Sequence, residues 1–331
     1  MSKKYNVLIV GDGRIGQAVT SILKKWRRIN SVRFYSAQQN VSSCDFFFGA
    51  LPGALGEQSL NLALKYRKPL IDIADIDPPF YLKHASAIKK NNLLVVPECG
   101  FSPGLVNLIL GYLIKKYCPV SRIEVAVGSL TKEKNTFPFL WCFEDLIAEH
   151  QLSSWQLVGG EKVKCPPFGD YRKETFFGIP AESCLCASGF EQFLSAPGLK
   201  SFTTRVVRPR GYQLFYEQLR SQGFFRKGHF DQTKKILEGQ KFDNMTFAIV
   251  NVVSRKRRLS WVIKSSASKR EKMNSMQKIT VSLPVVLARW ILTGKISQPG
   301  LKFAESFARD PEIFNALLKD VQKNGVDVFV N

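Results

Sequence analysis

The stretch "YNVLIVGDGRIGQAVTSILKKW", from Tyr5 to Trp26, decides the fold. Its first part, Tyr5–Val10, is short, apolar and β-branched, which predicts a buried strand of a parallel sheet. The apolar residues that follow the glycines recur at the spacing of one face of a helix. A strand, a glycine-rich turn and a helix in direct succession predict the first βα unit of an α/β domain.

The turn between these elements has the pattern G-x-G-x-x-G of dinucleotide-binding sites. Gly11 permits a tight turn, Gly13 lets a pyrophosphate approach the backbone, and Gly16 lets the helix pack closely on the strand. The helix N-terminus adds N–H groups and a positive dipole end. The residues predicted to bind the cofactor here are Gly11, Asp12, Gly13, Arg14, Ile15 and Gly16. The alternative is a glycine turn in an α/β protein that has lost its cofactor.

Strand-like and helix-like segments alternate from residue 5 to about residue 116, which predicts βαβ units and a doubly wound parallel sheet. Beyond that point, strands are joined by longer polar stretches without regular helices, as in an α+β domain on an antiparallel or mixed sheet. From Leu283 the pattern is helical again. We therefore expect an α/β protein with a Rossmann domain (1–117), an α+β substrate and dimerisation domain (118–282) and C-terminal helices (283–331).

The end of the second predicted strand indicates which nicotinamide cofactor binds. A carboxylate there would accept hydrogen bonds from the ribose of NAD and repel the 2′-phosphate of NADP. This sequence has Ser36 at that place, and no Asp or Glu lies between Ile29 and Cys44. The nearest basic residue is Arg33. The pattern allows NAD and favours NADP.

Ligands of doubly wound sheets bind beyond the carboxyl ends of the strands. The loop after the third strand offers Ala50, Leu51 and Pro52, against which a cofactor could lie. The next loop carries Asp72 and Asp75, which are predicted either to bind a substrate amino group or to serve as turn and N-cap residues.

The last strand of this series runs into "PECGFSPG" (97–104). Glu98 is a candidate acid–base group if burial raises its pKa, and the alternative is a solvated turn residue. Cys99 is a candidate substrate contact, although a cysteine is more often a small buried filler.

Bulk composition bounds the remaining functions. The seven cysteines lack metal-ligand spacing, which predicts reduced thiols in a cytoplasmic protein without a metal site. No run approaches the ~20 apolar residues of a membrane span, and no signal peptide is expected. The net charge of +21 is densest in Arg255–Lys272. A solvated basic face is the simpler interpretation, because Trp261 is the only aromatic residue of this cluster and nucleic-acid binding is not favoured.

Segments along nearly the whole chain resemble the saccharopine dehydrogenase-like oxidoreductases, which include saccharopine reductases, lysine 6-dehydrogenases and carboxynorspermidine dehydrogenases. The turn segment "VVPECGFSPGLVNLILGYL" resembles the family's G-hydrophobic-x-PG-hydrophobic-x-N, and "FPFLWCFEDLIAEH" (137–150) resembles W-S-x-E-x-hydrophobic-I-x-E-Y. "RPRGY" (208–212) resembles R-Y-P-G-H. "FFFGALPGALGEQSLNLAL", "VAVGSL", "GFEQFLSAPGLKSF" and "VVLARWILTGKISQPGL" resemble further family segments. The shorter, lysine 6-dehydrogenase-like branch is closest in length.

The resemblance implies that the C-terminal helices return to the Rossmann domain. It also implies NAD(P)-dependent oxidation or reduction of a C–N bond, by hydride transfer, in an amino acid or its imine. The substrate would be saccharopine-like, lysine-like or polyamine-like, and the protein a homodimer.

The resemblance also implies roles for single residues. Gly100 and Pro103 would form the wall behind the nicotinamide. Arg208 would bind a substrate carboxylate, because its planar fork suits one; the alternative is a surface arginine. Tyr212 stands where the family has a histidine, and is either a catalytic hydrogen-bond donor or an aromatic packed in the domain.

Two departures from the family pattern favour a second hypothesis. Arg210 replaces the proline of R-Y-P-G-H, and Tyr212 replaces its histidine. These changes are what a catalytically inactive NAD(P)-binding regulator with a basic interaction surface would have. The pattern gives no role to His84, His150 or His229.

Overall fold

The computed structural model describes residues 3–38, 40–186, 189–255 and 257–330. The chain forms two compact units, which we call unit 1 (1–116 and 277–326) and unit 2 (117–276 and 327–331). Each unit contains one β-sheet.

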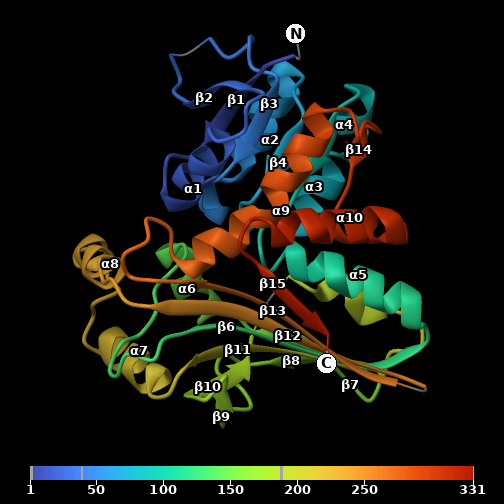
Figure 1. Ribbon diagram of the computed structural model, residues 1–331. Coiled ribbons are helices and arrows are strands. Elements are labelled where there is room, and N and C mark those ends of the chain that lie inside the picture. The colour runs from blue at the N-terminus through green and yellow to red at the C-terminus, as the bar shows by residue number, and fades with distance from the viewer. Residues whose placement is uncertain (1–2, 39, 187–188, 256, 331) are drawn as a thin grey trace. The chain divides into compact units, whose positions relative to one another are not determined.

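Unit 1 is built on a six-stranded parallel sheet with the order β2-β1-β3-β4-β5-β14 (Figure 1). Its strands are β1 (Tyr5–Val10), β2 (Ile29–Phe34), β3 (Phe46–Gly49), β4 (Leu70–Asp72), β5 (Leu94–Val96) and β14 (Gly300–Leu301). The chain reverses its direction across the sheet between β1 and β3, which is where doubly wound sheets bind ligands. The short strand β14 extends the sheet beyond β5 with the pairs Gly300↔Leu94 and Leu301↔Val95.

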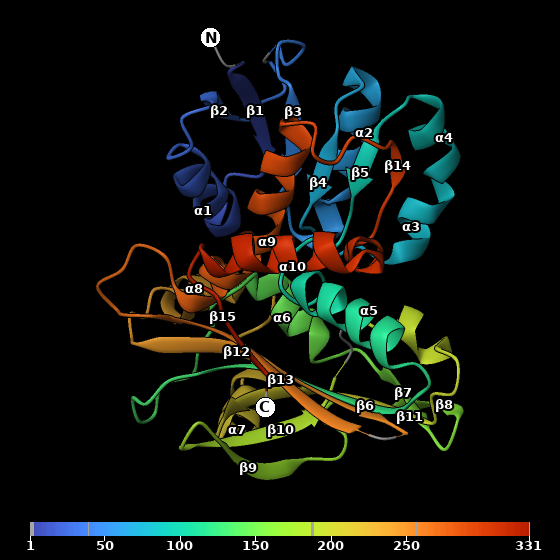
Figure 2. The ribbon, with the colours of Figure 1, turned by 45° about the vertical axis from the view of Figure 1, so that its right-hand side comes forward.

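Helices of both chain segments complete unit 1 (Figure 2). They are α1 (Arg14–Leu23), α2 (Glu57–Tyr66), α3 (Pro78–Lys83), α4 (Ala85–Lys90), α5 (Leu105–Tyr117), α9 (Ser275–Leu292) and α10 (Pro311–Gln322), with the 3-10 turns η1 (Gly53–Leu55) and η3 (Ala304–Arg309). The C-terminal helices return to this unit, as expected. The ring of Tyr112 on α5 stacks on Phe314 of α10 at 3.9 Å, and Arg289 of α9 lies over Trp26, 5.9 Å from the ring centroid.

Unit 2 contains a nine-stranded mixed sheet with the order β15-β13-β12-β6-β11-β10-β9, to which β7 and β8 are joined beside β11. Strand β11 is parallel to β6 and antiparallel to β10. The strands are β6 (Val120–Leu130), β7 (Ser154–Val158), β8 (Glu161–Cys165), β9 (Arg172–Phe176), β10 (Ile179–Leu185), β11 (Ser201–Pro209), β12 (Asn244–Ser254), β13 (Arg257–Ala267) and β15 (Asp327–Val330). The helices are α6 (Phe143–Glu149), α7 (Tyr212–Ser221), α8 (Phe230–Glu238) and the 3-10 turn η2 (Glu191–Ser195).

Two sequence expectations for unit 2 were wrong. The stretches between its strands contain three α-helices, of which α7 and α8 carry many polar residues and so resemble polar connections in the sequence. Residues 327–330 are not helical but form β15, which pairs with β13 through Ile263↔Val328. The pairing partner lies far away in the sequence, so no local pattern announces it. Unit 2 therefore gains residues 327–331, and its other boundary falls at 276 instead of 282.

Among the described residues, no helix combines the length and the apolar character needed to cross a membrane.

Candidate functional site

The glycine turn of unit 1 is shaped by two glycines that the fold leaves no room to replace. Gly11 has φ +119°, and a Cβ on it would lie 2.4 Å from the carbonyl oxygen of Ala50. A Cβ on Gly16 would lie 2.0 Å from the carbonyl oxygen of Gly11. Helix α1 therefore packs directly on the backbone of the turn, as the fingerprint predicts.

Gly13 has a different environment, because a Cβ placed on it would meet nothing within 4 Å. It is the N-cap residue of α1, and no side chain caps the helix there. The first N–H groups of α1 therefore open onto the surface beside exposed Asp12 and Gly13. Gln277 of α9 holds the turn from behind, since its Nε2 donates to the carbonyl oxygen of Arg14 at 3.0 Å. This cradle fits the pyrophosphate of a dinucleotide.

The second strand ends without a carboxylate. Tyr35 N still donates to Ile9 O, and Ser36 is exposed immediately after it. Arg33, the nearest cation, turns its Nη2 toward Ser43 Oγ and Cys44 Sγ, each at 3.3 Å.

The loop after β3 lies directly beside the glycine turn. Ala50 N donates to Val10 O at 2.8 Å, and the Ala50 backbone closes on Gly11. Leu51 and Pro52 follow as half-buried residues. The three residues predicted to border the cofactor are thus next to the fingerprint.

Asp72 was predicted as a possible contact for a substrate amino group, and the structure corrects this. Its side chain is fully buried, and both carboxylate oxygens are used within the unit: Oδ1 accepts from Ala74 N and Oδ2 from the Tyr81 hydroxyl, each at 3.0 Å. Burial raises the pKa of Asp72 to about 7, against the effect of these hydrogen bonds. Asp72 thus serves the turn, while Asp75 stands exposed on the same loop.

Glu98 lies at the end of β5 with an unusual backbone conformation. Its φ is +48°, and it is buried, with 4% of its surface exposed. Burial, the charge of Asp72 and, more weakly, the charge of Glu98 raise the pKa of Tyr81, so the two carboxylates and the phenol share one region. A non-glycine residue in the left-handed region is strained and persists because the surrounding fold holds it; Glu98 shares this conformation with six other described residues, most of them in turns.

The prediction that Cys99 contacts the substrate is corrected by the structure. Its side chain is fully buried, and burial raises the pKa of its thiol. A neutral, enclosed thiol offers a substrate neither charge nor accessible surface, so Cys99 fits the alternative of a buried filler.

The turn that follows is closed by its own backbone. Gly100 N donates to Pro103 O, and Leu105 N donates to Gly100 O, both at 3.0 Å. Gly104 has φ +127°, and a Cβ there would lie 2.2 Å from the carbonyl oxygen of Gly100. Gly100 also faces α9, since Thr280 Cγ2 would lie 3.6 Å from its added Cβ. The predicted wall residues Gly100 and Pro103 are thus parts of one rigid loop.

In unit 2, Arg208 is a buried cation near the end of β11, with 8% of its surface exposed. Its Nη2 lies 3.7 Å from Glu149 Oε2, and its Nη1 donates to the adjacent Val207 O at 3.3 Å. Its Nε has no hydrogen-bond partner among the described residues. A small recess borders Arg208 and is also lined by Glu182, Cys184 and Tyr212. The alternative of a surface arginine is wrong.

Glu149 balances this cation. Burial raises the pKa of Glu149, and the Arg208 charge and a hydrogen bond from Cys186 oppose that rise. The Cys186 thiol donates to Glu149 Oε1 at 2.6 Å. Glu149 in turn raises the pKa of Arg208 against the effect of burial, so the guanidinium stays charged.

Tyr212, predicted as a catalytic donor, requires a correction. It is 1% exposed within an apolar cluster, and its hydroxyl is hydrogen-bonded to His150 Nε2 at 2.9 Å. Burial raises the pKa of this phenol, so it is not poised to give up a proton. Sequence reasoning missed His150 entirely. The available signal was that His150 takes the tyrosine position of one family segment while Tyr212 takes the histidine position of another.

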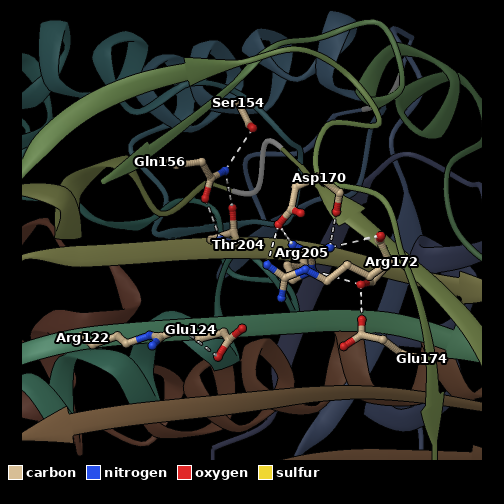
Figure 3. A network of polar contacts seen from close by, with 10 residues as sticks. Arg122, Glu124, Ser154, Gln156, Asp170, Arg172, Glu174, Thr204 and Arg205 are labelled. Atoms are coloured by element: carbon tan, nitrogen blue, oxygen red, sulfur yellow. Dashed lines mark hydrogen bonds and ion pairs between the residues drawn. The ribbon is translucent and has the colours of Figure 1, made fainter. Parts of the chain in front are cut away.

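A second buried arginine, Arg205, lies three residues before Arg208 on the same strand (Figure 3). Its Nε donates to Ser183 Oγ at 3.0 Å, its Nη1 to Asp170 Oδ2 at 2.7 Å, and its Nη2 to the backbone oxygens of Asp170 and Ser183. Asp170 also binds Arg172, as Figure 3 shows. Each nitrogen of this guanidinium therefore has an acceptor within the fold.

The basic cluster Arg255–Lys272 does not form one surface. Lys256 lies outside the described residues. The exposed cations Arg255, Arg257 and Arg258 surround the β12–β13 turn, whereas Lys269 and Lys272 follow the far end of β13. Nine strand residues (259–267) lie between the two groups, about 30 Å at the usual rise of a strand. In the part of the chain that the structure describes, no group of three or more His, Cys, Asp or Glu side chains could hold a metal ion.

No protein-family model matches this sequence, and no curated protein matches it either. Among solved structures, the chain is similar to apo saccharopine dehydrogenase (L-Glu forming) from Saccharomyces cerevisiae, with a TM-score of 0.76 and 12% identity over 99% of this chain and 100% of that chain. An engineered D-amino acid dehydrogenase has a TM-score of 0.49 and 10% identity over 96% of this chain and 99% of that one. C. glutamicum DAP dehydrogenase in complex with DAP reaches 0.48 and 11% over the same shares.

The likeness to the yeast enzyme extends over both chains in full and concerns the fold. It confirms the predicted α/β class with a Rossmann-like sheet and a second, mixed sheet. The other two likenesses are too distant to carry an argument. The chain has the fold of saccharopine dehydrogenase.

Proposed function

We propose that this protein is an NAD(P)-dependent oxidoreductase that acts on a C–N bond of an amino acid or its imine. The observation that carries the proposal is the cradle at Gly11, Gly13 and Gly16, where two glycines are closed by backbone and the middle one opens onto an uncapped helix end. The fold of saccharopine dehydrogenase supports the same class of reaction.

Unit 1 would hold the dinucleotide through the turn 11–16, Ser36 and the loop 50–52, with Gly100 and Pro103 behind its nicotinamide. A nicotinamide supplies hydride chemistry when it is bound. We further propose that NADP is preferred, because the strand end at Ser36 lacks the carboxylate that would repel a 2′-phosphate.

Glu98 is the acid–base group of the proposal. Its buried position at the end of β5 distinguishes it from a solvated turn residue. It would take up or release the proton at the substrate nitrogen. Arg208 in unit 2 is the group proposed to bind a substrate carboxylate, since its Nε has no acceptor among the described residues. Asp75 remains a candidate contact for an amino group, and we drop Asp72, Cys99 and Tyr212 as substrate contacts.

The first experiment measures cofactor binding. Purified protein is titrated with NADPH and NADH, and binding is followed by nicotinamide fluorescence. The proposal expects saturable binding of both, with the lower Kd for NADPH. If neither nucleotide binds, the proposed cofactor is wrong, and the proposed oxidoreductase activity is rejected with it.

The second experiment measures turnover with lysine, saccharopine-type adducts and polyamine imines, by nicotinamide absorbance in both directions. Turnover of any of them supports the enzyme and excludes a purely regulatory protein. Tight cofactor binding without turnover over this whole panel would instead favour the regulator, which the exposed Arg210 in place of the family's proline still motivates.

A further inference from the structure

Two adjacent residues at the end of α6 hold two residues at the junction of β11 and α7. Glu149, the last residue of α6, lies 3.7 Å from Arg208, and His150, its C-cap, is hydrogen-bonded to Tyr212 at 2.9 Å. The two partners are also in contact with each other, because the Arg208 guanidinium lies over the Tyr212 ring, 5.6 Å from its centroid. Arg208 is therefore held both by a carboxylate and by a phenol that a histidine anchors.

The same two positions are those at which this sequence departs from the segments it resembles. Where one segment has a tyrosine after its last glutamate, this chain has His150 after Glu149. Where R-Y-P-G-H ends in a histidine, this chain has Tyr212. Considered separately, each change replaces a residue of the family pattern. The hydrogen bond between the two side chains indicates a single exchange, in which the imidazole occupies the position of the phenol and the phenol that of the imidazole.

We propose that His150 and Tyr212 form an exchanged pair, in which His150 is the positioning residue that orients the Tyr212 hydroxyl and, through the Tyr212 ring, Arg208. The pair itself is a property of unit 2. Its consequence for substrate rests on the proposed function, in which Arg208 binds a carboxylate.

The pair that we propose has one direction of hydrogen bond. Arginine has only donors, and the Arg208 guanidinium lies over the Tyr212 ring, 5.6 Å from its centroid. We assign the phenol proton to the bond with His150 Nε2, so the imidazole carries its own proton on Nδ1.

The surroundings keep this imidazole neutral and in place. His150 is 7% exposed, and the rings of Phe168 and Tyr216 lie 4.8 Å from it on other sides. Burial, and next the Arg208 charge, lower the pKa of His150 to about 3. A charged imidazole beside Arg208 is thereby avoided, although Glu149 is its neighbour in the chain.

The test measures the coupling of the two side chains. His150→Phe, Tyr212→Phe and the double variant are unfolded in urea beside the exchange variant H150Y/Y212H and its two single components. Each single change should raise the unfolding equilibrium constant about 2- to 10-fold, the share of one hydrogen bond. The free energy of unfolding should fall no further in the double Phe variant than in either single Phe variant. H150Y/Y212H should be more stable than either of its single components.

Tyr216→Phe is the matched control, because Tyr216 contacts the same imidazole by its ring edge. Its effect on the free energy of unfolding should be additive with that of His150→Phe. The proposed pair would be overturned by additive losses of unfolding free energy for the His150 and Tyr212 changes. It would also be overturned if H150Y/Y212H were no more stable than its single components.

Nitrogen NMR of the three histidines gives a second readout, with His150 assigned by its absence in His150→Phe. A neutral ring protonated at Nδ1 at pH 6 supports the proposal. A charged ring, or a neutral ring protonated at Nε2, contradicts it.

Turnover separates this inference from the proposed function. With a substrate that bears a carboxylate, His150→Phe should raise KM several-fold and leave kcat nearly unchanged. An unchanged KM in a folded, active protein would sink the positioning role. If the parent protein turns over no substrate, the proposed function fails, while the unfolding and NMR data still decide on the pair.

Discussion

Two arginines of β11, three residues apart, are both buried and yet are treated in opposite ways by the fold. Arg205 donates to four acceptors on Ser183 and Asp170. Arg208 makes one long hydrogen bond to its neighbour's carbonyl and a 3.7 Å ion pair, and its Nε has no partner among the described residues. Because side chains alternate along a strand, the two lie on opposite faces of the sheet.

The difference separates a structural cation from one that is suited to a ligand. A buried guanidinium whose nitrogens all have acceptors in the protein is held by the fold and has little left to offer a ligand. One with unused donors retains the desolvation cost until an acceptor arrives. The same contrast occurs in unit 1, where Gly16 is closed by backbone and Gly13 faces open space. We expect ligand binding at Arg208 and at Gly13, the residue of each pair that the fold leaves open. Four predictions test this contrast.

The largest effect is expected for Gly16→Ala. Its Cβ would lie 2.0 Å from a carbonyl oxygen, so we expect the free energy of unfolding to fall by about 4 kcal/mol or more. Gly13→Ala should leave the stability within about 0.5 kcal/mol, because its Cβ meets nothing, and should weaken NADPH binding at least several-fold. Urea unfolding and fluorescence titration measure the two. Equal stabilities of the two variants would contradict the contrast.

Arg205→Ala should lower the free energy of unfolding by about 3 kcal/mol, since it removes a buried cation and strands the acceptors of Ser183. Asp170 keeps Arg172 and solvent, which limits the loss. KM of the folded fraction should not change. A raised KM with unchanged stability would mean that the roles of Arg205 and Arg208 have been assigned the wrong way round.

Arg208→Ala should raise KM about 30-fold for a substrate with a carboxylate, corresponding to about 2 kcal/mol for a hydrogen-bonded charge pair. Arg208→Ala also leaves Glu149 without its cation, so the double variant with Glu149→Gln is the matched control for stability. Steady-state kinetics and urea unfolding are measured on both. An unchanged KM would remove Arg208 from the substrate site.

Asp72→Asn should give the smallest effect, a gain of about 1–2 kcal/mol at pH 8. The folded pKa of Asp72 is raised from 3.8 to about 7, so its favourable contribution is complete below pH ~4 and is lost as pH rises toward 7. Asp72→Asn should remove this loss of stability at high pH. The free energies of unfolding of the variant and the parent protein should therefore converge near pH 4. Asp75→Asn, on the same loop but exposed, should show no such trend. A gain that is independent of pH would contradict the assignment.

Local patterns determined much of unit 1 in advance. The strand Tyr5–Val10, the glycine turn and α1 could be read from spacing alone, because a period of two, a period of 3.6 and glycine's freedom at Gly11 are all properties of short segments. The presence of strands beyond residue 116 was recognisable for the same reason. So was the missing carboxylate near Ser36, which is a statement about residue types.

Only the tertiary structure decided which polar residues are consumed by the fold. Asp72 and Asp75 look alike in the sequence, yet Tyr81 and Ala74 take both oxygens of the first and leave the second exposed. His150 and Tyr212 meet across 62 residues, and β15 finds β13 across a similar distance. Such pairings depend on how distant segments are brought together, and the energy of a buried donor depends on whether an acceptor is there. Residue type and spacing therefore predicted where a dinucleotide would lie, whereas the difference between Arg205 and Arg208 appeared only when their neighbours were in place.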